Sequence, residues 1–246
     1  MTQLNGKTAL VTGGSRGIGA AIAKRLARDG ADVAITYAKS ADQAAAVVGE
    51  IKKLGRRGLA IAADSGDAGA VKVAVDRAAK EFGRLDILVN NAGVYTTTAF
   101  EETPLAEVDR VWDVNVRAAI VGSQAAIRHM KQGGRIISIG SCLGERVGSP
   151  GITLYSMSKA ALIGFTKGLA RDVGPRGITV NCVEPGPIDT EMNPAGGEGA
   201  DAQRSMLALG HYGTVDDIAA MVAHLAGDGG RFVTGAAILV DGGYAA

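Results

Sequence analysis

Short apolar runs alternate along the chain with longer stretches in which apolar residues recur every three or four positions. The short runs are typical of strands buried on both faces of a parallel sheet, and the longer spacing predicts amphipathic helices. Seven strands are predicted, at Thr8–Thr12, Asp32–Thr36, Gly58–Ala62, Ile87–Val89, Arg135–Ile139, Thr179–Val183 and Ala237–Val240. Six helices are predicted between them, at Gly17–Asp29, Ala41–Leu54, Gly69–Phe82, Leu105–Lys131, Leu154–Val173 and Val215–Ala226.

This repeated alternation of strand and helix predicts an α/β fold with a doubly wound parallel sheet and helices on both faces. The chain has no linker, charge block or internal repeat, so we expect residues 1–246 to form a single domain. One stretch after the sixth strand is rich in Pro and Gly, and long loops in compact domains usually serve function. We expect a mobile substrate lid around residues 187–210; an ordinary surface loop is the alternative.

Composition narrows the possible partners. Of 246 residues 36 are Gly, but no collagen period is present and 47% of residues are hydrophobic. The 26 basic and 25 acidic residues leave a net charge of +1, which argues against a nucleic-acid partner. The two Cys form no CxxC pair, no apolar run is long enough to cross a membrane, and the start of the chain has no apolar leader. We therefore expect a cytoplasmic protein with no membrane partner.

The first predicted strand runs through Thr12-Gly13-Gly14-Ser15-Arg16-Gly17-Ile18-Gly19 directly into a helix. A Gly-rich turn in this place brings backbone N–H groups against a pyrophosphate at the helix N-terminus. Gly13 would allow the turn, Gly17 the approach of the phosphate and Gly19 close packing of helix on strand. The alternative is a tight strand–helix turn without a ligand.

The end of the second predicted strand indicates which dinucleotide is bound. NAD sites usually place an acidic residue there, to hold the ribose 2′-hydroxyl. Here the strand is followed by Tyr37, Lys39 and Ser40, and Arg16 lies in the Gly-rich turn. Basic side chains hold a 2′-phosphate by charge-assisted hydrogen bonds. We therefore expect NADP(H) in preference to NAD(H), with solvated surface charges as the alternative.

Tyr155 and Lys159 are four residues apart on a predicted helix and so share one face. A Tyr phenol with its usual pKa of about 10 is a poor proton donor at neutral pH, and a nearby ammonium group lowers that pKa. Ser141 follows the fifth strand, where its hydroxyl would hold a substrate oxygen. The pattern predicts proton chemistry; a solvated helix face is the alternative. No His/Cys/Asp cluster suggests a metal.

With these motifs the chain resembles the short-chain dehydrogenase/reductase family in its roughly 250-residue form, over almost its whole length. The matching pieces are Thr12-Gly13-xxx-Gly17-x-Gly19, Asp64, Asn90-Asn91-Ala92-Gly93, Asn115, Ser141, Tyr155-xxx-Lys159, Pro185-Gly186 and Thr190. The resemblance implies a Rossmann-type sheet of about seven strands. It also implies that Tyr155 is the general acid during hydride transfer and that Ser141 orients and polarises the carbonyl. Lys159 would bind the nicotinamide ribose and lower the pKa of Tyr155, and Asn115 would hold a water in a proton relay.

The resemblance implies further contacts for the cofactor and the substrate. Asp64 and Ser65 would meet the adenine. The full set of cofactor residues implied is Gly13, Ser15, Arg16, Gly17, Ile18, Gly19, Tyr37, Lys39, Ser40, Asp64, Ser65, Asn91, Ala92, Gly93, Tyr155, Lys159, Pro185, Gly186, Ile188 and Thr190. The substrate residues implied are Ser141, Leu143, Tyr155, Pro187 and Met192.

Within the family the chain is most similar to 3-oxoacyl-carrier-protein reductases and related carbonyl reductases, which implies reduction of a ketone or aldehyde to an alcohol. Arg171 matches one residue expected to dock a carrier protein, but Gln132 stands where a second basic residue is expected. Two alternatives stay open: a 3-oxoacyl-carrier-protein reductase proper, and a nucleotide-binding regulatory protein without turnover. The family also implies a homotetramer formed through the two long helices and the C-terminal end.

Overall fold

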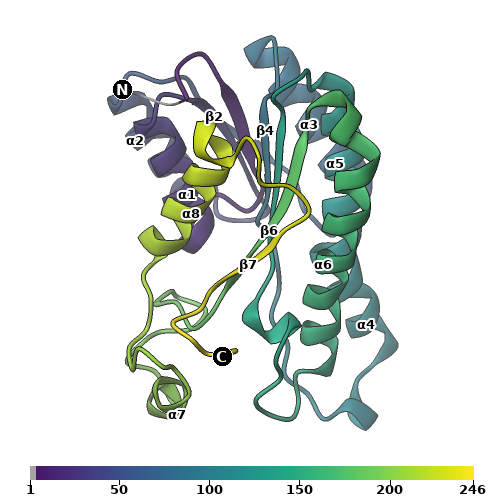
Figure 1. Ribbon diagram of the computed structural model, residues 1–246, viewed down its shortest axis with the longest axis vertical. Helices are drawn as coiled ribbons and strands as arrows, with labels where there is room; N and C mark the ends of the chain where they lie inside the picture. Colours follow the sequence, from purple (N-terminus) through teal and green to yellow (C-terminus); the bar gives the residue numbers. More distant parts are fainter. Residues whose placement is uncertain (1–3) are drawn as a thin grey trace.

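The computed structural model describes residues 4–246 and contains one parallel sheet of seven strands (Figure 1). Their order across the sheet is β3-β2-β1-β4-β5-β6-β7, so the direction of winding reverses between β1 and β4. This arrangement confirms the predicted doubly wound α/β fold. The strands are β1 (Thr8–Val11), β2 (Asp32–Tyr37), β3 (Gly58–Ala62), β4 (Ile87–Asn90), β5 (Arg135–Ile139), β6 (Thr179–Pro185) and β7 (Ala237–Val240).

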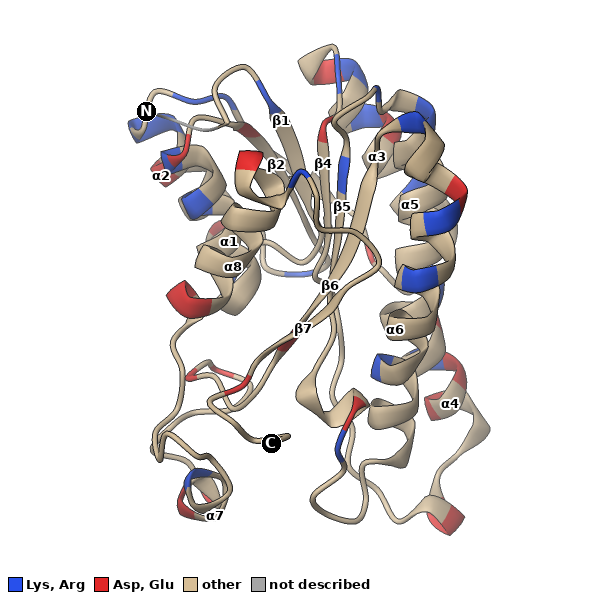
Figure 2. Cartoon of the chain, viewed as in Figure 1, with Lys and Arg blue, Asp and Glu red and all other residues tan. Residues whose placement is uncertain are grey.

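Helices cover both faces of the sheet. On one side α1, α2 and α8 pack over an apolar core, and on the other side α3, α5 and α6 pack over a second core (Figure 1). Charged residues lie mainly on the outer helices and at the ends of the strands (Figure 2). The helices are α1 (Gly17–Arg28), α2 (Ala41–Lys53), α3 (Ala68–Phe82), α4 (Leu105–Trp112), α5 (Ala118–His129), α6 (Thr153–Val173), α7 (Ala200–Ser205) and α8 (Val215–Ala226).

All seven predicted strands are confirmed, with differences only at their ends. β1, β4, β5 and β6 are buried at every position, as expected of strands covered on both faces. β6 continues two residues beyond the predicted Val183, because Glu184 and Pro185 still pair with β7. This extension brings Pro185 into the sheet and places the following turn directly at its carboxyl edge.

The predicted helix Leu105–Lys131 is not regular. A π-helical turn at Asp113–Arg117 separates α4 from α5, and the helix ends at His129 because Met130 is already extended. Apolar spacing alone does not reveal such a turn, since both flanking halves keep the helical repeat. π turns insert one residue into a helix and are frequent at functional sites; this one contains Asn115.

The segment after β6, predicted as a lid around residues 187–210, contains a short helix that the sequence did not indicate, α7. The first residues of the segment are hydrogen-bonded to the turn before α8. Gly213 N donates to Pro187 O at 3.0 Å, and Asp189 N donates to Gly213 O at 3.0 Å. Farther on, Arg204 donates to Ala195 O at 2.7 Å. The segment is therefore held at the carboxyl edge of the sheet, the lower end in Figure 1, by hydrogen bonds within itself and to the turn before α8.

Two helical glycines provide a matched test of this packing. A Cβ on Gly19 in α1 would lie 2.4 Å from both Asn91 Nδ2 and Gly13 O, whereas one on Gly49 in α2 would meet no atom within 4 Å. We expect Gly49→Ala to raise the free energy of unfolding by about 0.5–1 kcal/mol, since Ala favours helix over Gly. Gly19→Ala should instead lower it by about 1–3 kcal/mol through overpacking. Urea unfolding of both variants checks this, and stabilisation of Gly19→Ala would contradict it.

Candidate active site

The ends of β1 and β4 are joined by side-chain hydrogen bonds at the carboxyl edge of the sheet. The Thr12 hydroxyl accepts from Asn91 N at 3.0 Å and from Ala92 N at 3.1 Å. In return, Asn91 Nδ2 donates to Thr12 O at 2.9 Å and to Gly13 O at 3.1 Å. Gly13 N donates to Thr36 Oγ1 at 3.0 Å. The predicted Gly-rich turn, the Asn91–Gly93 segment and the end of β2 are thereby brought together.

The Gly-rich turn has the shape of an anion cradle. A Cβ on Gly13 would lie 3.0 Å from Ala92 Cα, so the chain can pass there only without a side chain. Gly17 has φ +52°, and the nearest atom to a Cβ built on it is Thr190 Cγ2 at 3.9 Å, which leaves room in front of the turn. Arg16 is the N-cap of α1, and no side chain of residues 4–246 caps the helix there. Its first N–H groups can therefore bind a phosphate.

The basic residues predicted to select the cofactor lie around this turn. Arg16 is exposed, and its Nη1 lies 3.1 Å from Glu191 Oε2 in the segment after β6. Gly14 N donates to Thr36 O at 2.9 Å, so Tyr37, Lys39 and Ser40 follow β2 from a point fixed beside the turn. Asp64 and Ser65 follow β3, and Asp64 Oδ1 accepts from Gly66 N at 2.9 Å. The predicted cofactor residues Arg16, Tyr37, Lys39, Ser40, Asp64 and Ser65 therefore all follow the carboxyl ends of β1, β2 and β3.

Tyr155 and Lys159 lie on successive turns of α6, as predicted. The Lys159 Nζ lies over the Tyr155 ring, 5.5 Å from its centroid, and donates to Ile139 O at the end of β5 at 2.9 Å. Lys159 is only 4% exposed. Within residues 4–246 Ile139 O is its one acceptor, which leaves two ammonium hydrogens for other partners.

The pKa of Tyr155 was expected to be lowered by Lys159, but in the protein without cofactor it is raised. Burial raises the pKa of the Tyr155 phenol to about 12, opposed by a hydrogen bond with Ser141. Burial also lowers the pKa of Lys159 to about 8. Loss of water contact therefore outweighs any effect of the ammonium, which lies over the ring face. As a result Tyr155 carries its proton throughout the neutral range.

Ser141 and Asn115 complete the predicted catalytic group. Ser141 caps a short 3-10 turn, Cys142–Gly144, and its hydroxyl accepts from Leu143 N at 3.2 Å. Asn115 Oδ1 accepts from Val94 N at 2.8 Å. Asn115 Nδ2 donates to Val94 O and to Ser158 Oγ, each at 3.0 Å.

The Asn115 amide thus has both hydrogens engaged by protein. Among the described residues Oδ1 accepts one hydrogen bond, which leaves a lone pair for the water that the family resemblance implies there. The side chain also has a structural role, because it joins the loop after β4 to α6, one residue before Lys159.

The turn after β6 approaches the end of β7 closely. Gly186 N donates to Val240 O at 3.1 Å, and a Cβ on Gly186 would lie 2.6 Å from Asp241 Cα. The Ile188 side chain is buried in the core beside α8. A cofactor could therefore contact only the backbone of Ile188. Met192 is 62% exposed, as a residue at an open edge would be.

One residue of this region, Tyr95, was missed by sequence reasoning, and a second, Arg146, has a partner that the sequence does not reveal. Tyr95 packs edge-on against Tyr155, with ring centroids 4.9 Å apart. Its position five residues after Asn90 in the loop following β4 was the only available signal. Arg146 donates to Tyr244 O at 2.8 Å and to Ala246 O at 3.1 Å. Nothing in the sequence around residue 146 indicates this partner far along the chain.

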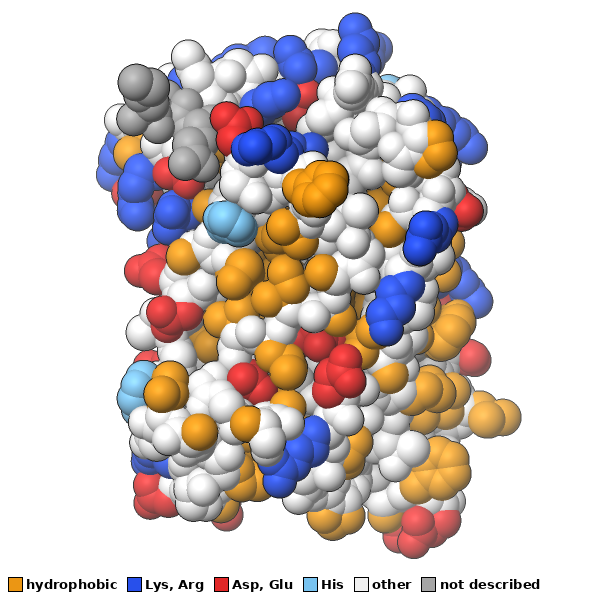
Figure 3. Space-filling view, viewed as in Figure 1, with side chains coloured by type: hydrophobic (Ala, Val, Ile, Leu, Met, Phe, Trp, Pro, Cys, Tyr) orange, Lys and Arg blue, Asp and Glu red, His pale blue; other side chains and the backbone are white. Residues whose placement is uncertain are grey.

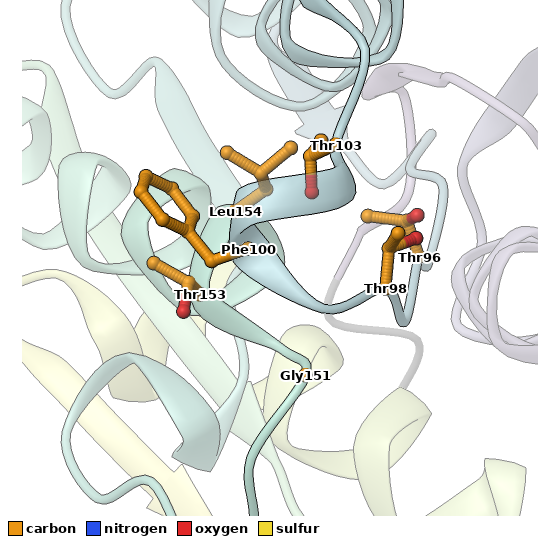
Figure 4. Close-up of a pocket in the computed structure, with 7 residues that line it drawn as sticks. All are labelled: Thr96, Thr98, Phe100, Thr103, Gly151, Thr153 and Leu154. Atoms are coloured by element: carbon orange, nitrogen blue, oxygen red, sulfur yellow. The ribbon is translucent and has the colours of Figure 1, made fainter.

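A cavity beside Tyr95 is too small for a substrate. Its volume is about 10 Å³, room for about one water. Threonine hydroxyls from the loop after β4 line one side, and the start of α6 lines the other (Figure 4). The lining residues are Thr96, Thr98, Phe100, Thr103, Gly151, Thr153 and Leu154.

Glu184 is a further residue that the sequence did not single out. It lies in β6, fully buried at 0% exposure, and neither carboxylate oxygen has a hydrogen-bond partner within residues 4–246. A Cβ on Gly140, next to Ser141, would lie 3.4 Å from Glu184 Oε1. Burial, followed by the charge of Glu145, raises the pKa of Glu184 to about 7.

Two kinds of site are absent from residues 4–246. No group of three or more His, Cys, Asp or Glu side chains is arranged to hold a metal ion. No helix in this part of the chain is long and apolar enough to span a membrane.

The chain is similar in sequence and structure to known proteins. Residues 13–245 match the family profile described as enoyl-(acyl carrier protein) reductase. A short-chain dehydrogenase from Burkholderia cenocepacia J2315, crystallised with NADP, is 61% identical, with a TM-score of 0.98 over 99% of this chain and 100% of that one.

Two curated relatives carry different descriptions. The cyclic-di-GMP-binding biofilm dispersal mediator protein of Escherichia coli K12 is 45% identical over the full length of both chains. The 3-oxoacyl-[acyl-carrier-protein] reductase of Staphylococcus aureus Mu50 is 42% identical over 96% of this chain and 97% of its own.

The buried carboxyl of Glu184 gives a prediction for stability. A pKa raised from 4.5 to about 7 means that the folded protein holds this proton more tightly than the unfolded chain. Stability from this group is full below pH 4.5 and is lost as pH rises through about 7, by about 2–3 kcal/mol between pH 5 and pH 8. Glu184→Gln should remove that part of the fall in urea unfolding. Glu198→Gln, an exposed control, should keep it; an unchanged fall in Glu184→Gln would contradict the assignment.

Proposed function

Because the chain belongs to the short-chain dehydrogenase/reductase family, we propose that it is an oxidoreductase that reduces a ketone or aldehyde to an alcohol with NADPH. The observation that carries the proposal is the convergence of Ser141, Tyr155 and Lys159 at the sheet edge that also holds the Gly-rich turn, where a Cβ on Gly93 would lie 3.4 Å from Lys159 Nζ. These groups come from the end of β5 and from α6, and the turn follows β1. A sheet edge at which the winding reverses is where α/β proteins bind dinucleotides.

The cofactor fits the residues present. The turn around Gly13, Gly17 and Gly19 would hold the pyrophosphate with backbone N–H groups at the start of α1. Lys159 has two ammonium hydrogens for the nicotinamide ribose. When bound, the reduced nicotinamide supplies the hydride.

The chain's own residues would supply the proton. In this proposal Ser141 donates a hydrogen bond to the carbonyl oxygen, and Tyr155 gives that oxygen its proton as the alcohol forms. A phenol with a pKa of about 12 is fully protonated at neutral pH, which supports the reducing direction. Lys159 and a water on the free lone pair of Asn115 Oδ1 would return the proton to Tyr155 from solvent.

A preference for NADP(H) over NAD(H) is supported by charge. Arg16 lies in the turn and Lys39 follows β2, where no acidic residue stands to hold a 2′-hydroxyl. The 61% identical dehydrogenase was crystallised with NADP. We infer that Arg16 holds the 2′-phosphate, with Lys39 and Ser40 as further contacts.

Two alternatives have some support. The Staphylococcus aureus relative is described as a 3-oxoacyl-[acyl-carrier-protein] reductase. In this chain an acidic carrier protein could bind to Arg171, but Gln132 stands where a second basic residue is expected. The Escherichia coli relative is described as binding cyclic di-GMP, which supports a regulatory nucleotide-binding role. A purely regulatory protein does not need Tyr155, Lys159, Ser141 and Asn115 together, so we favour the enzyme. A panel of carbonyl compounds assayed with NADPH and NADH in parallel distinguishes the three.

Self-association is also proposed, as a homotetramer. Apolar side chains gather on the face over α8 and β7 (Figure 3). Phe232, between those elements, is 99% exposed and Leu239 is partly exposed. In α6, Gly164 and Gly168 have open space where a Cβ would be, which suits close helix packing. A cytoplasmic location is likewise part of this proposal.

Replacement of the proposed acid tests the chemistry. Tyr155→Phe removes only the phenolic oxygen, so we expect kcat for carbonyl reduction to fall about 10²- to 10⁴-fold. The dissociation constant for NADPH, measured by fluorescence titration, should change little. Tyr95→Phe makes the same change on the neighbouring ring and should keep most of the turnover. Near-normal reduction by Tyr155→Phe would reject the mechanism.

Replacement of Arg16 tests the choice of cofactor. Arg16→Ala should weaken binding of NADPH at least tenfold more than binding of NADH, because a charge-assisted bond to the 2′-phosphate is lost. Paired titrations of the two cofactors give the ratio. An equal loss for both would mean that the 2′-phosphate is held elsewhere.

A further inference from the structure

One ion pair joins the Gly-rich turn to the segment after β6. Arg16 Nη1 and Glu191 Oε2 lie 3.1 Å apart, although the residues are 175 positions apart in sequence. The two side chains are 59% and 61% exposed, so neither is held in place by burial. This is the same guanidinium that the proposed function assigns to the 2′-phosphate.

Glu191 is presented by a turn that is stable without it. Asn193 N donates to Thr190 O and to Thr190 Oγ1, both at 3.2 Å, and closes the turn around Glu191. Thr190 Cγ2 is the nearest atom to a Cβ built on Gly17, at 3.9 Å, so this turn lies opposite the Gly-rich one. The neighbouring Asp189 is engaged otherwise, since its Oδ1 accepts from Ala195 N at 2.9 Å. The Glu191 carboxylate is therefore the acidic group of this turn that reaches Arg16.

We propose that Glu191 is a specificity-determining residue that competes with the cofactor's 2′-phosphate for Arg16. A guanidinium binds carboxylate and phosphate through the same planar set of N–H groups, so one partner displaces the other. Glu191 therefore weakens binding of NADPH and leaves NADH, which has no 2′-phosphate, unaffected. The inference rests on the proposed function.

The competition also links the two segments. An Arg16 side chain that binds the 2′-phosphate no longer ties the start of residues 187–210 to the Gly-rich turn. The reverse holds by linkage: a stronger Arg16–Glu191 pair lowers the affinity for the phosphorylated cofactor. Exposed ion pairs change an equilibrium constant by a factor of only about two to five, and salt screens them. Glu191 is thus expected to adjust the preference for NADPH rather than to create it.

The test is a set of binding titrations with Glu191→Gln. This variant should bind NADPH about two- to fivefold more tightly than the unmodified protein, and NADH equally well. Adenosine 2′,5′-bisphosphate should show the same gain and adenosine 5′-monophosphate none, because the 2′-phosphate alone senses the change. Glu198→Gln removes an equal charge from the same segment and should change none of these affinities. The gain of Glu191→Gln should shrink at 0.5 M NaCl.

A cycle with Arg16→Ala separates competition from simple repulsion. In the Arg16→Ala background Glu191→Gln should no longer tighten NADPH, since nothing is left to compete for. A gain that persists there, a gain shared by NADH, or unchanged binding of NADPH by Glu191→Gln would each overturn the inference while leaving the enzyme assignment intact. An unmodified protein that binds neither cofactor would overturn both, and the first titration shows which case holds.

Discussion

Four hydrogen bonds between Thr12–Gly13 and Asn91–Ala92 join the carboxyl ends of β1 and β4, where the winding of the sheet reverses. Helices leave a doubly wound sheet toward opposite faces at this point, and Thr12 N also donates to Val89 O at 3.0 Å. The bonds align the Gly-rich turn with the loop that leads to Val94, and Asn115 holds that loop through Val94. The turn proposed to bind the cofactor and the groups proposed to transfer a proton are thereby positioned from one junction.

Around this junction the site contains polar groups whose ordinary solvation has been removed. Lys159 keeps one backbone acceptor, Tyr155 is surrounded largely by protein, and the Glu184 carboxylate has no hydrogen-bond partner within residues 4–246. Burial of such groups costs stability, and proteins retain that cost mainly where function requires it. For Tyr155 and Lys159 the proposed proton transfer supplies the reason. Glu184 lies against Gly140, one residue from Ser141, which places a carboxyl group with a pKa of about 7 behind the end of β5.

Much of this could be predicted from sequence because the signals are local. Buried strands are apolar runs, and Tyr155 and Lys159 share a helix face because they are four residues apart. The Arg16–Glu191 pair could not be predicted, since its members are 175 residues apart and exposed residues pair without a pattern. The direction of the Tyr155 pKa depended on burial, which the identity of neighbouring residues does not give. The site-residue roles were drawn from family resemblance, and they stay predictions until the variants are measured.

The π turn at Asp113–Arg117 has a consequence for how the chain tolerates change in length. A helical residue accounts for about 100° of rotation, so the extra residue sets the phase between α4 and α5. α4 packs against α6, whereas α5 packs against α3 and β4. Loss of a single residue from the turn would leave a continuous regular helix but rotate one half relative to the other. Either the packing of α4 on α6 or the packing of α5 on α3 and β4 would then be lost. A deletion within Asp113–Arg117 should therefore be tolerated less well than one in an exposed helix.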